Sequence, residues 1–75
     1  METIEEYRIS QAIMWSLIQQ IETVEGRVAG CIKAGIELST VHHYLSEAID
    51  EVRMEMSRRH NEQARAGNLP EGDWE

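Results

Sequence analysis

The sequence predicts an all-α protein, a two-helix antiparallel hairpin that dimerises into a four-helix bundle. Two long stretches repeat apolar residues every three or four positions, which is typical of amphipathic helices. The only proline of the 75 residues is Pro70, so neither stretch contains a strong helix breaker. The first stretch also carries more apolar surface than one partner helix covers, which predicts self-association.

The first helix is predicted over residues 3–34. Thr3 and Glu6 match a capping box, in which the side chain of each residue binds the backbone N–H group of the other. Glycine adopts the left-handed conformation readily. We therefore expect Gly35 to end this helix and Ile36 to close back on it.

Two glycines, Gly26 and Gly30, fall inside this first helix one turn apart. An interior glycine costs up to ~1 kcal/mol relative to alanine. Two interpretations are open: the small residues let another helix approach closely, or the first helix frays or breaks near Gly26. We favour a continuous helix.

The second helix is predicted over residues 40–66, with Ser39 or Thr40 as its N-cap and Gly67 as its stop signal. Its expected core stripe comprises Val41, Tyr44, Leu45, Ala48, Ile49, Val52 and Met56. Residues 68–75 contain proline, glycine and acidic residues and are predicted to form a flexible acidic tail. The helical hairpin, residues 1–67, is the one expected domain.

The apolar residues of the first helix cover roughly 200° of its circumference, whereas one antiparallel neighbour covers a stripe nearer ~100°. The second helix also turns polar after Met56, although the stretch of the first helix that faces it stays apolar. The simplest cover is a second copy, because symmetric dimers are the commonest soluble assembly. The expected dimer core comprises Met14, Leu17, Ile18, Ile21, Val24, Val28, Leu45 and Val52. The sequence leaves open whether this surplus apolar surface serves dimerisation or target binding.

Charge and cysteine content narrow the functional class. The chain has 14 acidic and 7 basic residues, a net charge of -7, which argues against non-specific binding to duplex DNA. Cys31 is the only cysteine, which excludes an intrachain disulfide and fits a reducing compartment. The acidic N-terminus lacks the basic region of a secretory signal, and no apolar run approaches the ~20 residues of a membrane span. We expect a cytoplasmic protein with no membrane partner.

No segment carries a catalytic signature, so we expect no enzymatic activity and no cofactor. The side chains with the most metal-binding potential are Cys31, His42, His43 and Glu47. They lack the Cys-x-x-Cys or His-x-x-x-His spacing that is typical of zinc sites. No metal site is predicted, and a metal-dependent role is kept as a third alternative.

Positive charge in the second helix gathers in its later half, at Arg53, Arg58, Arg59 and Arg65. Two copies in a bundle would align these residues into a basic stripe, which is the alternative nucleic-acid-binding site. This hairpin architecture resembles the Rop family of plasmid RNA-binding regulators, which are short helical hairpins with an acidic tail that dimerise into four-helix bundles. The resemblance covers the hairpin alone and transfers no site residue. Given the overall acidity, we favour pairing of these arginines with glutamates.

Large apolar side chains are the candidates for binding a larger protein. They are Ile4, Tyr7 and Trp15 in the first helix and Trp74 in the tail. Tryptophan and tyrosine often anchor interfaces, although filling the dimer core is the alternative role for Tyr7 and Trp15. The sequence thus predicts a small, non-enzymatic, homodimeric regulator or inhibitor of a larger protein, of the kind encoded by phages and mobile elements. RNA or nucleotide binding in the Rop manner is the runner-up.

Overall fold

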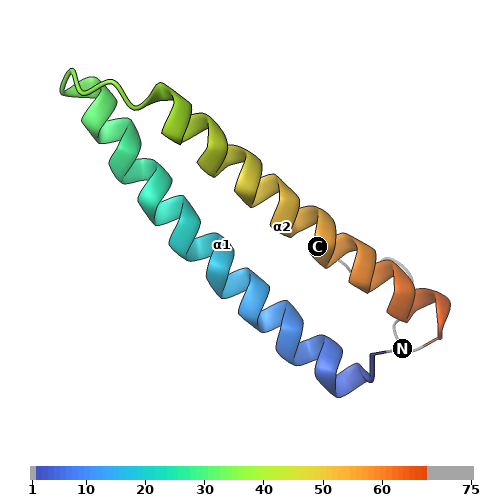
Figure 1. The fold of residues 1–75 in the computed structure, drawn as a ribbon. Coiled ribbons are helices and arrows are strands. Elements are labelled where there is room, and N and C mark those ends of the chain that lie inside the picture. Colours follow the sequence, from blue (N-terminus) through green and yellow to red (C-terminus); the bar gives the residue numbers. More distant parts are fainter. Residues whose placement is uncertain (1, 68–75) are drawn as a thin grey trace.

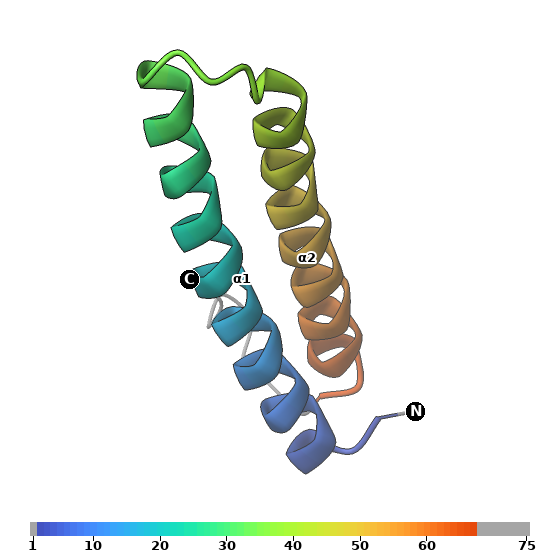
Figure 2. The same ribbon diagram turned by 60° about the vertical axis from the view of Figure 1, so that its left-hand side comes forward.

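The computed structural model of the chain describes residues 2–67. They form two helices, α1 (Ile4–Lys33) and α2 (Ser39–Arg65), which lie side by side and run in opposite directions (Figure 1, Figure 2). The prediction of an all-helical, two-helix hairpin is confirmed, and each helix end lies within one residue of its predicted bound. The predicted tail, residues 68–75, lies outside the described residues.

Helix α1 begins with the predicted capping box. The Thr3 hydroxyl accepts a hydrogen bond from the Glu6 N–H group at 3.1 Å, and the Glu6 carboxylate accepts one from the Thr3 N–H group at 3.1 Å. Two N–H groups at the helix start are thereby satisfied. Hydrogen bonding with Thr3 lowers the pKa of Glu6, and the bond from the Thr3 backbone has the largest effect.

Helix α1 continues without a break through Gly26 and Gly30. A Cβ atom added at either glycine would meet nothing within 4 Å. The interpretation that the helix breaks near Gly26 is therefore wrong. Close approach of α2 does not explain these glycines either, because the space beside each is open within the hairpin.

The end of α1 follows the predicted glycine-based turn. Gly35 has a φ of 92°, a left-handed conformation that costs glycine little. The Ile36 N–H group donates to the Cys31 carbonyl, and the Gly35 N–H group donates to the Ile32 carbonyl, both at 3.0 Å. These two bonds form a Schellman motif, which satisfies carbonyls at the helix end while the chain reverses.

Helix α2 begins differently from the prediction. Its N-cap is Leu38, and no side chain caps the helix in the usual way, so the assignment of Ser39 or Thr40 as the N-cap is wrong. The Glu37 carboxylate instead accepts a hydrogen bond from the Ser39 N–H group at 2.8 Å. Hydrogen bonding with Ser39 lowers the pKa of Glu37. An acidic side chain just ahead of the helix therefore does part of the work of a cap.

The buried core of the hairpin is small. Ile18 of α1 packs with Ile49 and Met56 of α2 as its centre. Ile18 is fully buried, and the half-buried side chains packed against this centre are Met14, Ile21 and Val52. Most other large apolar side chains of the described residues remain at least partly exposed. The hairpin therefore leaves much apolar surface in contact with water.

Candidate interaction surfaces

The hairpin has two long sides, and a polar contact between the helices lies on each of them. On one side, Arg59 of α2 approaches the hydroxyl of Ser10 on α1 at 3.4 Å. On the other side, Arg53 of α2 lies 3.5 Å from the carboxylate of Glu22 on α1. At about 100° per residue, Ser10 and Glu22 fall on opposite flanks of the buried Ile18. The two sides differ sharply in chemistry.

The Ser10 side is mostly apolar. Helical residues seven apart share a face, so Leu17, Val24 and Cys31 follow Ser10 along α1. On α2, Val52 and Leu45 precede Arg59 at the same spacing. We call this side the seam face, and it comprises Leu17, Val24, Val28, Cys31, Val41, Leu45, Ala48 and Val52. Leu17, Val24 and Val41 are 43%, 45% and 44% exposed.

The seam face repeats apolar residues with heptad spacing. On α1 the intervals alternate between three and four along Met14, Leu17, Ile21, Val24, Val28 and Cys31. On α2 the intervals are four, three and four along Val41, Leu45, Ala48 and Val52. Alternation of three and four is the pattern by which one helix packs along another. Helix α1 thus presents two seams, one used by α2 in this hairpin and one open.

The seam face becomes polar toward the end of the hairpin opposite the connecting loop. Beyond Val52, the equivalent positions of α2 are Glu55, Arg59 and Glu62. Arg59 lies 2.5 Å from the carboxylate of Glu2 and 2.8 Å from that of Glu55. Hydrogen bonds, first from Arg58 and then from Arg59, lower the pKa of Glu55 to about 2. This end of the face is a network of paired charges.

The predicted basic stripe is largely engaged by carboxylates. Arg58 contacts Glu55 and Glu62, each at 2.5 Å, while Arg59 and Arg53 pair with other glutamates as described above. Hydrogen bonding and charge attraction, first from Glu55 and then from Glu62, raise the pKa of Arg58. Arg65 lies in the last turn of α2. Such pairs cancel the local positive charge on which phosphate binding depends.

The structure corrects the placement of Tyr7. This side chain was expected on an apolar surface that α2 leaves uncovered, but it is only 6% exposed. Its hydroxyl lies 3.0 Å from Nδ1 of His60, which is itself buried. The Gln11 amide donates to the Tyr7 hydroxyl and to the Met56 carbonyl, both at 3.4 Å. The polar half of α2 therefore does cover the start of α1.

A second buried amide supports this cluster. Gln63 is 2% exposed, and its Nε2 donates to the backbone carbonyl of Glu2 at 2.7 Å. The sequence prediction ended the core stripe of the second helix at Met56, so it assigned neither His60 nor Gln63 to the core. The signal that it missed is their position, since Met56, His60 and Gln63 follow one another at intervals of four and three along the buried stripe.

The Glu22 side carries the remaining exposed anchor. Trp15 lies seven residues before Glu22, so both side chains share this face. Trp15 is 55% exposed, whereas Ile4 near the start of the same helix is half-buried. We call this side the tryptophan face, and it comprises Trp15, Glu22 and Arg53. The fourth predicted partner-binding residue, Trp74, lies outside the described residues.

The residues proposed for the dimer core separate into two groups. Ile18 and Val28 are buried in the hairpin itself, and Met14, Ile21, Leu45 and Val52 are half-buried. Leu17 and Val24 are exposed on the seam face. The first group is thus already used by the fold, whereas the second group has no cover within residues 2–67.

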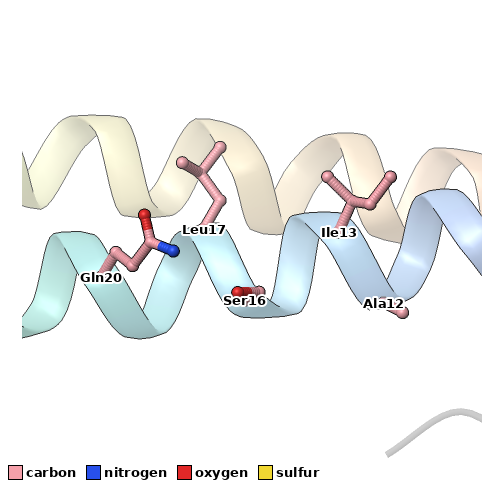
Figure 3. Close-up of a pocket in the computed structure, with 5 residues that line it drawn as sticks. All are labelled: Ala12, Ile13, Ser16, Leu17 and Gln20. Atoms are coloured by element: carbon pink, nitrogen blue, oxygen red, sulfur yellow. The ribbon is translucent and has the colours of Figure 1, made fainter.

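A shallow hollow of about 420 Å³ adjoins the seam face. It runs along one helix and is lined by Ala12, Ile13, Ser16, Leu17 and Gln20. Figure 3 shows Ile13 and Leu17 projecting from α1 in the same direction one turn apart, with Gln20 further along the helix. These lining side chains offer one hydroxyl and one amide as polar groups, so the hollow suits packing against apolar side chains better than catalysis.

The residues weighed for metal binding do not converge. His43 lies 3.2 Å from Glu47 on an exposed turn of α2, while Cys31 is half-buried near the end of α1. Across residues 2–67, no three His, Cys, Asp or Glu side chains gather closely enough to hold a metal ion. Neither helix, over the same residues, has a stretch long and apolar enough to cross a membrane.

The sequence matches no protein-family profile, and comparison with curated proteins and with solved structures finds no similar chain. The surfaces described above are therefore the basis for any functional assignment.

Proposed function

We propose that this chain is a small, non-enzymatic regulator or inhibitor that binds a larger protein and acts as a homodimer. The observation that carries the proposal is Trp15, a large apolar side chain that is 55% exposed on the tryptophan face. Tryptophan and arginine are the residues most enriched among those that dominate interface energetics, and Arg53 lies on the same face. Trp15 is the proposed anchor in the target.

The surroundings of Trp15 support a protein target. Glu22 and Arg53 form a pair with 43% and 56% exposed side chains, which can rearrange to meet polar groups of a partner. Polar groups around an aromatic anchor are typical of protein–protein interfaces. The net charge of -7 favours a target with a basic surface, because opposite charges speed association. The proposal extends to a cytoplasmic accessory protein of a phage or mobile element that blocks a host protein.

RNA or nucleotide binding is less well supported. The arginines that would contact phosphates are Arg53, Arg58 and Arg59, and each is paired with at least one carboxylate. Release of these arginines for phosphate would leave the glutamates beside the nucleic acid, where like charges repel. We therefore place the protein-binding role first.

The test uses a photo-reactive amino acid at position 15 of the full chain, expressed in its host. We expect a covalent adduct with one host protein and no such adduct when the same group stands at position 9. Ile9 is the matched control because it is 59% exposed on the same helix, away from the tryptophan face.

Affinity for the purified target then measures the anchor. We expect Trp15→Ala to weaken binding by about 30-fold or more and Ile9→Ala to change it less than about 3-fold. Circular dichroism verifies that both variants keep their helices. Equal affinities for the two variants, or recovery of nucleic acid alone, would refute the proposal.

A further inference from the structure

We infer that a second copy of this chain packs against the seam face, so that the tryptophan face stays open for the target. The assignment of the open face rests on the proposed function. The assignment of the seam face rests on the geometry of the hairpin, and it names which of the two sides joins the copies.

The first support is the helix-packing pattern of the seam face. Met14, Ile21 and Val28 belong to both seams of α1, because each lies between the buried flank and the open flank of the helix. Leu17 and Val24 complete the open seam and are 43% and 45% exposed. A helix in a four-helix bundle contacts two neighbours through two such adjoining seams. Helix α1 has this pattern, although the hairpin supplies only one neighbour.

The second support is that the apolar parts of the two helices lie level with each other. The Tyr7–His60 contact and the 2.5 Å hydrogen bond from Ser46 to Glu25 fix which residues of α1 and α2 are opposite. In this register Leu17 is level with Val52, and both belong to the seam face. The seam face is therefore apolar nearest the loop and charged at the other end. A second copy carries the same apolar part, so the face complements itself about a two-fold axis.

The third support is size. The structure measures 51 × 19 × 16 Å, so a second copy lying along a whole long side, the charged end included, faces an area of about 800 Å², comparable with what each partner buries in a typical stable complex. A short peptide would cover only part of this length. A second hairpin of equal length covers all of its apolar part.

The fourth support is that the hairpin has a small core and needs further apolar burial for stability. The buried centre that residues 2–67 form from Ile18, Ile49 and Met56 is small. Chains of about this size commonly need disulfides, a bound metal or oligomerisation for stability, and a single cysteine allows no intrachain disulfide. A second copy is present wherever the chain is made, whereas an unrelated partner is present only in some settings. The seam face is therefore assigned to the copy.

Sedimentation equilibrium of the full chain, over a wide range of concentration, tests the inference. We expect a dimer of twice 8.6 kDa for the wild type. Leu17→Glu with Val24→Glu is expected to raise the dimer dissociation constant by about 100-fold or more, because it places charges in the seam. The matched control is Trp15→Glu with Thr23→Glu, which adds the same charge to α1 away from the seam. This control is expected to stay within about 3-fold of the wild type.

A second measurement covers the case in which the seam variant fails to fold. A photo-reactive amino acid at position 24 of an otherwise wild-type chain is expected to yield covalent dimers, and at position 23 to yield none. A well-folded wild-type monomer of 8.6 kDa would overturn the inference. So would a dimer that the control variant disrupts, or crosslinking from position 23 and not from position 24.

The two proposals fail separately. If target binding depends on Trp15 but the wild type is monomeric, the seam inference is wrong and the proposed function stands. If the dimer depends on Leu17 and Val24 but no target contacts Trp15, the dimer stands and the proposed function is wrong.

Discussion

At the scale of single residues, the most informative feature is the buried hydroxyl of Tyr7. It lies 3.0 Å from His60 Nδ1 and receives a hydrogen bond from Gln11. A buried polar group left without its partner costs more than an exposed one, because no water replaces the lost hydrogen bond. The contact joins residues 53 positions apart in the sequence, so it also helps to fix the pairing of the two helices.

We expect Tyr7→Phe to lower the free energy of unfolding by about 1–3 kcal/mol, because it removes the hydroxyl from the His60 side chain. Urea unfolding at fixed protein concentration measures the change. Tyr44→Phe is the matched control, since it deletes the same atom from a side chain that is 63% exposed, and its effect is expected within about 0.5 kcal/mol of zero. Equal losses from both variants would contradict the role of the buried hydroxyl.

The ion pairs of Glu55 predict a pH dependence. Contacts with Arg58 and Arg59 lower its pKa from 4.5 to about 2, so the folded state favours the charged carboxylate. This stabilisation is complete above pH 4.5 and is lost as the pH falls toward 2. We expect Glu55→Gln to flatten the fall in melting temperature across that window.

Thermal melts at several pH values provide the measurement. Glu51→Gln removes one charge from an exposed position of the same helix, and its melts are expected to follow the wild-type slope. If Glu55→Gln melts with the same acid slope as wild type, the pairs with Arg58 and Arg59 do not persist in solution.

At the scale of the helices, one glycine within α1 and one just after it separate two physical effects. Gly26 lies in the helix with open space where a side chain would be, whereas Gly35 has a φ of 92°. We expect Gly26→Ala to stabilise the protein by up to about 1 kcal/mol, because alanine loses less conformational freedom in a helix. Gly35→Ala is expected to destabilise it by about 1–2 kcal/mol, because an L side chain is strained at that φ.

Thermal and urea unfolding of the two variants measure these effects, and each variant serves as the control for the other. Two changes of the same sign would mean that backbone conformation does not govern these positions.

The helices themselves were predictable because their signals are local. Thr3 and Glu6 define the start of α1, Gly35 defines its end, and both motifs form as expected. The start of α2 was not predictable from N-cap preferences. Leu38 occupies the cap position, and the compensating hydrogen bond comes from Glu37 ahead of it. N-cap preferences are averages over many helices, whereas the short loop between α1 and α2 decides at which residue α2 begins.

The candidate sites were harder to predict than the helices. Helical periodicity predicted a surplus of apolar surface on the first helix, but it did not separate the buried Ile18 from the exposed Leu17, nor did it predict the burial of Tyr7. Polar residues of α2 at the buried stripe cover Tyr7, and hydrophobicity alone does not reveal them. Tertiary hydrogen bonds such as Tyr7–His60 decide such cases, and no local rule contains them.

At the scale of the whole molecule, the proposed dimer through the seam face predicts that stability depends on protein concentration. For a chain that folds as a dimer, mass action favours the folded state as concentration rises. We expect each tenfold increase in protein concentration to add about 1.4 kcal/mol to the apparent stability, seen as a shift of the urea midpoint.

The variant Leu17→Glu with Val24→Glu is the control for this shift. Any of it that remains folded is expected to unfold at one midpoint regardless of concentration. Superimposable wild-type curves across the concentration range would show that the folded unit is a single hairpin.

The unlike sides of the hairpin have a further consequence. If a two-fold axis conceals one side of each copy, the opposite sides point outward in two directions, each with its own Trp15. Such an assembly is bivalent. It would grip a dimeric target far more tightly than a monomeric one when both sites engage together, and it would crosslink targets that display several copies of the epitope.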